Sequence, residues 1–234
     1  MFDALEWIWS TIPRGTEFWS AITGALVGGM IAFVVQMIAL RAAKSQRSED
    51  YKLVQQGLGN SLLFKMIRIH VNFQAINRHI EACFEGAGRR GLVGEPWQFV
   101  LPLANPPNPI HFSSEEMGML LAQKVDEVFN SVLSIDVLHN GLIDAVKTLN
   151  DRRMALTERI AAGKVEGEVA VGGLAHAELL AIRPRMIELN TLIEQLRADA
   201  SKAVEESGDV LGRLHQLLRE KLGLPYRLVA NIAR

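Results

Sequence analysis

A long run of apolar residues without any charge is the first pattern along the chain. Residues 18–40 read FWSAITGALVGGMIAFVVQMIAL and include no Asp, Glu, Lys or Arg. At about 1.5 Å of rise per residue, a helix of that length crosses the roughly 30 Å hydrocarbon core of a bilayer. A core helix of a soluble protein would show a polar stripe every three or four residues, and this run shows none. The pattern therefore predicts a transmembrane helix over residues 18–40.

The flanks of this run also suit a membrane. Phe18 and Trp19 stand at its start, where aromatic side chains favour the interface between lipid and water. A cleaved signal peptide is the alternative. However, the preceding stretch is acidic rather than basic, the run is longer than about 15 residues, and no small-x-small cleavage site follows it. We therefore expect a retained anchor.

The distribution of basic residues predicts the orientation of this anchor. One basic residue, Arg14, precedes the run. Four follow it closely: Arg41, Lys44, Arg47 and Lys52. Because basic flanks stay on the cytoplasmic side, we expect a single-pass protein of a bacterial inner membrane. Its N-terminus would lie outside, and its body, residues 45–234, would lie in the cytoplasm.

The stretch before the run is amphipathic. Its apolar residues share one side of a short helix that would end at Pro13: Phe2, Leu5, Ile8, Trp9 and Ile12. Residues 1–13 are therefore predicted to form an interfacial helix on the outer side of the membrane. A disordered tail is the alternative.

A strip of small side chains recurs every four residues within the run: Ser20, Gly24, Gly28, Ala32 and Gln36. Small residues let two helices approach closely, and the terminal amide can hydrogen-bond across such a contact. The strip predicts a homo-oligomer formed through the membrane helix. The alternative is a chance pattern, because glycine and alanine are common in spanning helices.

Beyond the membrane run, apolar residues are spaced four and three apart, which is typical of helices packed side by side. The predicted helices cover residues 48–85, 113–162, 175–207 and 209–222, with a break at residues 207–209, Ser-Gly-Asp. Ser113 and Glu116 form a capping box at the start of the second helix. We therefore expect an all-α fold. A single N-terminal transmembrane helix would precede an antiparallel bundle of three long helices plus a short C-terminal helix.

A proline-rich loop, residues 86–112, separates the first two predicted helices. If the second helix returns antiparallel to the first, this loop lies at the tip of the bundle and residues 163–174 lie near the membrane. Trp97 and Phe99 make the loop too apolar for a free linker, so we expect them to anchor it. The loop either covers the open end of the bundle or binds a protein partner. Covering is favoured, because exposed apolar loops invite aggregation.

His139 occupies an apolar seam position, between Ile135 and Leu142. A polar residue at such a position commonly fixes the register of packed helices. In an antiparallel arrangement His139 would lie level with three polar residues of the first helix: Gln55, Gln56 and Asn60. A catalytic histidine would need an orienting carboxylate and a cleft, and the sequence indicates neither.

Composition narrows the classes of function. The chain has 25 basic and 26 acidic side chains, and this balance argues against a nucleic-acid-binding protein. Its single cysteine, Cys83, excludes an internal disulfide framework. His79 shares a helix face with Cys83, but two ligands fall short of a zinc site. The sequence contains no phosphate loop, dinucleotide-binding or nucleophile-elbow motif, so we expect neither cofactor nor metal.

Together these patterns favour a membrane-anchored helical interaction or scaffold protein without enzyme activity. Its expected partners are the lipid bilayer, a second copy of the chain and a cytoplasmic protein. One alternative is a membrane effector whose spanning helices oligomerise and perturb the bilayer. The other is a membrane-bound enzyme with a site in the bundle core, at His70, His79 or His139.

Overall fold

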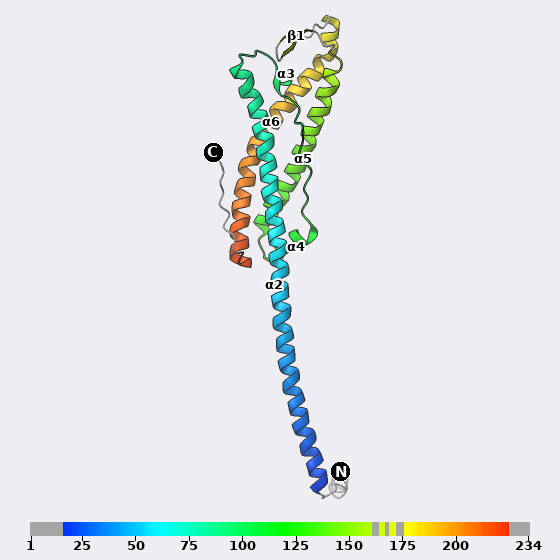
Figure 1. The fold of residues 1–234 in the computed structure, drawn as a ribbon, viewed down its shortest axis with the longest axis vertical. Coiled ribbons are helices and arrows are strands. Elements are labelled where there is room, and N and C mark those ends of the chain that lie inside the picture. Colours follow the sequence, from blue (N-terminus) through cyan, green and yellow to red (C-terminus); the bar gives the residue numbers. More distant parts are fainter. Residues whose placement is uncertain (1–15, 161–163, 167–168, 172–175, 225–234) are drawn as a thin grey trace, which may run out of the picture. The chain divides into compact units, whose positions relative to one another are not determined.

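The computed structural model describes residues 16–160, 164–166, 169–171 and 176–224. Its elements are shown in Figure 1: α2 (Thr16–Arg89), α3 (Pro96–Phe99), α4 (Ser114–Ala122), α5 (Asp126–Thr157), β1 (Lys164–Glu166), β2 (Val169–Val171) and α6 (His176–Leu222). The chain divides into two compact units, Met1–Val54 and Gln55–Arg234. The predicted all-helical fold is confirmed, apart from the small β1–β2 hairpin. The predicted interfacial segment, residues 1–13, lies outside the described residues.

In the first unit the described residues form an apolar stretch of α2 that is long enough to cross a membrane. None of its most apolar window is buried within the chain, and Leu26, Met30 and Phe33 are among its exposed side chains. The helix does not end where the apolar run ends. It continues without interruption to Arg89, so the predicted membrane helix and the first predicted bundle helix are one element.

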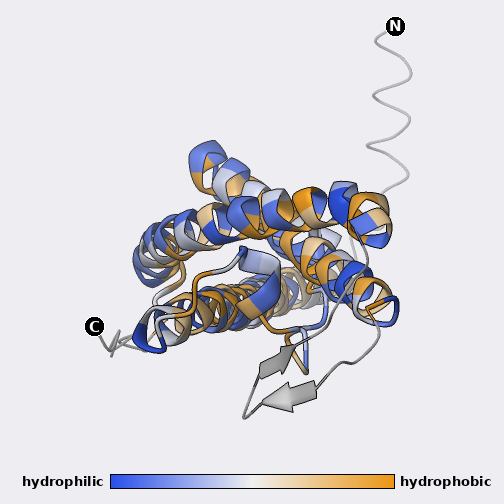
Figure 2. Cartoon of the chain, turned by 90° about the horizontal axis from the view of Figure 1, so that it is seen from above, coloured by the Kyte–Doolittle hydropathy of each residue, from blue (hydrophilic) through white to orange (hydrophobic). Residues whose placement is uncertain are grey.

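In the second unit the later part of α2 packs with α5 and α6 around one hydrophobic core, which confirms a helical bundle. The α2 positions spaced four and three apart are buried, as their spacing predicts: Leu62, Met66, Ile69, Phe73, Ile76 and Ile80. Each long helix carries apolar and polar residues around its circumference, as Figure 2 shows. Burying an apolar stripe against the neighbouring helices is the main source of stability for such elements.

The direction of the second long helix differs from the prediction. Two contacts show that α6 runs antiparallel to α2: Gln56 with Leu222, and Glu81 with Arg197. Two more show that α6 also runs antiparallel to α5: Glu127 with Arg213, and Arg152 with Glu188. Helices α2 and α5 are therefore parallel to one another, as Figure 1 shows. The expected antiparallel hairpin of the first two helices is wrong.

The reason is the course of the proline-rich connection, which does not stay at one end of the bundle. After α2 and the short α3, residues 100–113 run back in extended form beside α2 and α5, and we call these residues the strap. Leu101 contacts His79, whereas His111 contacts Lys65, more than three helical turns earlier in α2. The strap returns the chain, so α5 can start again in the direction of α2. The hairpin after α5 therefore lies at the end of this unit where α2 ends, not at the end that holds Gln55.

Two predicted helix boundaries also differ. The predicted helix over residues 113–162 is divided into α4 and α5 by a turn in which Lys124 has a positive φ of 57°. Conversely, α6 passes through the predicted break at residues 207–209. Ser207 is fully buried, and its hydroxyl hydrogen-bonds the carbonyl of Val204 and the ring of His70. Tertiary packing of Ser207 thus outweighs the weak helix propensity of this stretch.

Strands β1 and β2 form an antiparallel hairpin in which Lys164 lies opposite Val171 and Glu166 opposite Val169. They belong to the glycine-rich connection between α5 and α6. The hairpin is the one sheet among the described residues.

Candidate functional site

Two asparagines of α5 hold the strap by its backbone. The side-chain oxygen of Asn150 accepts from the amide of Leu103 at 3.2 Å, and its NH₂ group donates to the carbonyl of Leu103 at 3.1 Å. Asn140 repeats this pairing with the amide and carbonyl of Ile110, at 3.3 and 3.2 Å. Each side chain thus satisfies both backbone groups of one strap residue, as a neighbouring β-strand would. Such pairing does not depend on the side chain of the residue it holds.

Helix α2 holds the same segment from its other side. His79 donates from Nε2 to the carbonyl of Leu101 at 2.8 Å, and Lys65 donates from Nζ to the carbonyl of His111 at 3.1 Å. Prolines at positions 102, 106, 107 and 109 carry no amide hydrogen, so the strap has few donors to satisfy. The two helices therefore form a polar seat for an extended chain.

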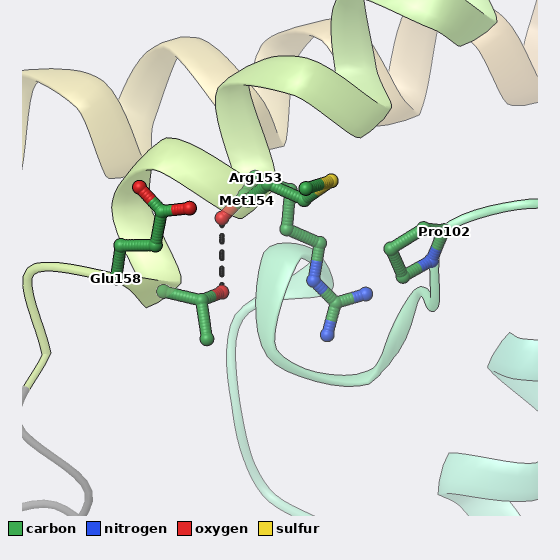
Figure 3. A pocket seen from close by; sticks show the side chains of 5 residues that line it. Pro102, Arg153, Met154 and Glu158 are labelled. Carbon is green, nitrogen blue, oxygen red and sulfur yellow. Dashed lines mark hydrogen bonds between the residues drawn. The ribbon is translucent and has the colours of Figure 1, made fainter.

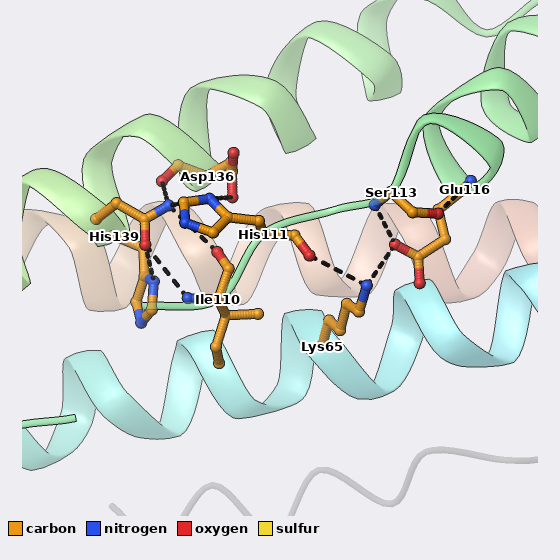
Figure 4. A network of polar contacts seen from close by, with 8 residues as sticks. Lys65, Ile110, His111, Ser113, Glu116, Asp136 and His139 are labelled. Atoms are coloured by element: carbon orange, nitrogen blue, oxygen red, sulfur yellow. Dashed lines mark hydrogen bonds and ion pairs between the residues drawn. The ribbon is translucent and has the colours of Figure 1, made fainter. Parts of the chain in front are cut away.

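Glu116 is the centre of the network that continues from the strap into α4 (Figure 4). Its carboxylate accepts from Ser61 Oγ at 2.5 Å, from Lys65 Nζ at 2.7 Å and from the amide of Ser113 at 2.7 Å. The amide of Glu116 donates back to Ser113 Oγ at 3.2 Å, so the predicted capping box is confirmed. Burial alone would raise the pKa of Glu116, but the hydrogen bonds from Lys65, Ser61 and Ser113 outweigh it. The pKa lies below its usual value, and the carboxylate is ionised at neutral pH.

His139 lies in the core, fully buried, but its partner is not the predicted one. Asn72 of α2 lies 3.0 Å from its Nε2, Asn140 lies 3.3 Å from its Nδ1, and Phe73 packs edge-on against its ring. A pairing with Gln55, Gln56 or Asn60 is excluded, because α5 runs parallel to α2 and brings His139 to a later level of that helix.

Burial holds the pKa of His139 below its usual value, although the Asn140 contact opposes this shift. The ring is therefore neutral at pH 7. Since Asn140 Oδ1 can only accept, Nδ1 carries the proton and Nε2 accepts from Asn72. Asn140 also donates to the carboxylate of Asp136 at 3.3 Å. Burial raises the pKa of Asp136, and the nearby His111 opposes part of this shift. The carboxylate of Asp136 lies 4.0 Å from Nδ1 of His111, so among the described residues it pairs with His111 and does not orient His139.

Trp97 and Phe99 lie at the end of this unit where α2 ends. The amide of Trp97 donates to Asn190 Oδ1 of α6 at 3.0 Å, and its indole donates to Glu95 at 3.1 Å. Phe99 packs edge-on against Phe84, with ring centroids 5.0 Å apart. Both side chains are half-buried and pack against the core. The choice between covering the bundle and binding a partner stays a prediction.

The strip predicted for helix association lies in the first unit. Gly24, Gly28, Ala32 and Gln36 are all exposed. A methyl group placed on Gly24 or Gly28 would meet no atom within 4 Å. Within the second unit, Trp97 and Phe99 contact α6 and the end of α2, whereas His139 contacts Asn72, Phe73 and Asn140, so the structure does not bring these predicted residues together into one site.

An open hollow of about 390 Å³ lies beside the strap, lined by Pro102, Arg153, Met154, Thr157 and Glu158 (Figure 3). Thr157 donates to the carbonyl of Arg153 at 2.9 Å. Nη2 of Arg153 donates to the carbonyl of Gln98 at 3.4 Å, whereas Nη1 is buried without a partner. Because protein atoms cover Nη1 and Glu158 lines the same hollow, the arrangement is a poor anion site.

Sequence reasoning identified His139 and the capping box but missed the two asparagines, which the structure makes the main contacts to the strap. The sequence does contain a pattern that could have identified these asparagines. Asn140 and Asn150 each stand beside a buried α5 position, His139 and Leu149, where a polar side chain can reach an adjoining segment. Which segment it reaches depends on tertiary structure.

No protein family, characterised protein or solved structure shows significant similarity to this chain. Within the described ranges, no three His, Cys, Asp or Glu side chains are grouped as a metal site.

Proposed function

We propose that this protein is a membrane-anchored interaction module that presents a helical bundle at the cytoplasmic face of a bacterial inner membrane. The observation that carries the proposal is α2 itself. Its first part exposes an uncharged apolar surface, and the same uninterrupted helix contributes the core positions of the bundle. A large exposed apolar surface on one helix is stable in lipid and unfavourable in water.

The use of the polar side chains supports an interaction module over an enzyme. Glu116, His139 and the two asparagines of α5 hold backbone segments or one another in place. A catalytic acid, base or nucleophile would instead direct its reactive atom toward a cavity that admits a substrate. The hollow at Arg153 is lined by one cationic and one acidic side chain, and neither His139 nor Glu116 lines it.

Membrane extraction tests the anchor. The full chain with a C-terminal tag is expressed in bacteria, and membranes are washed with alkaline carbonate. We expect the protein to remain in the pellet and a Met30→Lys, Val34→Lys double variant to be released, because each charge at a helix centre costs about 2.5–3.5 kcal/mol of insertion. Release of the wild type by carbonate would contradict the proposal.

Affinity purification tests the interaction. From native membranes the tagged full chain should bring down a second copy or another protein in near-stoichiometric amount. If it recovers neither above the level found with the double lysine variant, an interaction module is the wrong conclusion.

A membrane effector is the second candidate, and the open faces of Gly24 and Gly28 favour it. Because nothing covers these glycines, several copies of α2 can approach closely in the membrane. Overexpression in cells loaded with a membrane-potential dye separates the candidates. An effector depolarises the membrane and loses this activity in Gly28→Ile, whereas an interaction module leaves the potential unchanged.

A further inference from the structure

The strap is bound mainly through its main chain. Hydrogen bonds from Asn150, Asn140, His79 and Lys65 end on its backbone amides or carbonyls, and one further bond joins Asn140 to the ring of His111. Hydrogen bonds to a main chain provide affinity for any extended segment, and pockets for individual side chains provide the choice between segments. The surface of α2 and α5 under the strap is therefore built like a peptide-binding surface.

The exposure of the strap's own side chains shows which of its positions contact this surface. Val100 and Ile110, at opposite ends, are 1% and 7% exposed, so each fills an apolar position of the core. Between them Leu101 is 57% exposed, and Ala104 and Asn108 are also exposed. Leu103, between them, is partly buried and also packs against the core. The surface therefore contacts apolar side chains at both ends of the strap and at Leu103, and leaves several other positions exposed to solvent.

The prolines define the class of peptide further. Proline fixes φ near the value of an extended polyproline helix, so a segment rich in proline loses little conformational entropy on binding. It also offers few amide donors that would remain unsatisfied beside a helix. The surface therefore fits an extended proline-containing peptide with apolar residues about ten positions apart.

We infer that the α2–α5 surface is a peptide-recognition site, that the strap is its intramolecular occupant, and that an extended proline-containing segment of another protein competes with the strap for it. This inference rests on the proposed interaction function and names its partner. The strap has the advantage of being tethered, with an effective concentration in the millimolar range. The segment before α3 includes Gly91, with a positive φ of 62°, and the fully exposed Val93. Helix α3 lies between this segment and the strap and packs against the core, so a competing peptide has to displace the strap while α3 stays in place.

The experiment weakens the binding of the strap to the α2–α5 surface and adds the same segment as a separate peptide. In the full chain, solubilised in detergent, Ile110→Asp removes the strap's buried anchor and leaves both asparagines intact. A fluorescent peptide with the wild-type sequence of residues 100–112, VLPLANPPNPIHF, is then titrated and its anisotropy measured. We expect binding to Ile110→Asp at least tenfold tighter than to the wild type, whose own strap competes.

Two matched comparisons test whether the surface binds the peptide through hydrogen bonds to the peptide's main chain. Adding Asn150→Ala to Ile110→Asp should weaken binding of the peptide about tenfold, because both hydrogen bonds to the backbone of Leu103 are lost. N-methylation of the peptide at Leu103, whose amide Asn150 binds, should weaken it by several-fold. N-methylation at Ala104, whose amide makes no hydrogen bond in the described structure, should have little effect. Equal binding of the two methylated peptides would overturn the inference.

Hydrogen exchange in the wild-type chain provides a test that does not depend on a variant. A strap that can be displaced opens locally, so the amides of Leu103 and Ile110 should exchange faster than the core amides of α5. Exchange of these amides only through global unfolding would overturn the inference, as would absence of peptide binding to a folded Ile110→Asp. Both results leave carbonate extraction and recovery of a partner unaffected, so failure of this inference is distinct from failure of the proposed function.

Discussion

Glu116 provides a quantitative test of how α4 and the strap are held to α2. The residue is 2% exposed, and one carboxylate oxygen accepts from Ser61 while the other accepts from Lys65 and the amide of Ser113. Glutamine has nearly the same shape, but its NH₂ group must face one of these donor sets. At least one donor then loses its acceptor, and Lys65 loses its counter-ion.

The expected cost follows from these contacts. A hydrogen bond to a charged group contributes about 1.5–3 kcal/mol, and an unsatisfied buried donor costs a similar amount. The side chain of Lys65 is 29% exposed, so water replaces part of what it loses. We therefore expect Glu116→Gln to lower the free energy of unfolding by about 2 kcal/mol at pH 7.

The pKa shift of Glu116 also predicts how the stability difference between wild type and Glu116→Gln changes with pH. The pKa of Glu116 is depressed in the folded protein: burial opposes this shift, and the hydrogen bonds from Lys65, Ser61 and Ser113 exceed it. Its contribution is therefore fully present above the unfolded pKa of about 4.3 and is lost as pH falls through the lower folded pKa. The difference between wild type and Glu116→Gln should be constant from pH 7 to about pH 5 and should shrink in more acidic solution.

Urea unfolding of the full chain in detergent, followed by circular dichroism, measures this difference. Glu115→Gln is the matched control, because Glu115 lies in the same turn of α4 but is exposed, and it should change stability by less than about 0.5 kcal/mol. A difference for Glu116→Gln below about 0.5 kcal/mol, or one that stays constant in acid, would refute this account of the Glu116 network.

The features that sequence predicted correctly depend on local spacing. The buried seam of α2, from Leu62 to Ile80, follows from apolar steps of four and three, because that spacing places side chains on one face of a helix. The capping box of Ser113 and Glu116 likewise involves residues three apart. Such patterns need no knowledge of the rest of the chain.

The features that sequence missed depend on long-range contacts. A loop of the length of residues 86–112 permits either a turn at the bundle end or a return along its side. The return is held by long-range contacts, among them those of Asn140 and Asn150, which lie 30 and 47 positions from the strap residues they bind. The parallel course of α5, and with it the true partner of His139, follows from that return. The break expected after Ser207 fails for the same reason, since His70 of α2 contacts Ser207 from 137 positions away.

Four further predictions address the membrane helix, α3 and the bundle core. A C-terminal alkaline-phosphatase fusion should be inactive in bacterial cells, because the body is expected in the cytoplasm and the reporter needs export; an active fusion would reverse the orientation. Gly28→Ile should weaken self-association measured by crosslinking in membranes while leaving insertion intact, and an unchanged oligomer ladder would show that the small-residue strip is not the interface. Trp97→Ala should cost about 2–3 kcal/mol, less than a fully buried tryptophan, because its side chain is half-buried against the core; a melting temperature within about a degree of wild type would favour partner binding by α3 instead. His139→Phe keeps a ring in the core but cannot take up a proton. Since burial depresses the pKa of His139, the unfolded chain binds a proton more readily than the folded one, and wild-type stability should fall as pH drops from about 7 through 6.5. The variant retains the similar contribution of His70, so it should lose less stability than wild type over the same interval; equal losses in urea titrations would mean that His139 is not held neutral by the core.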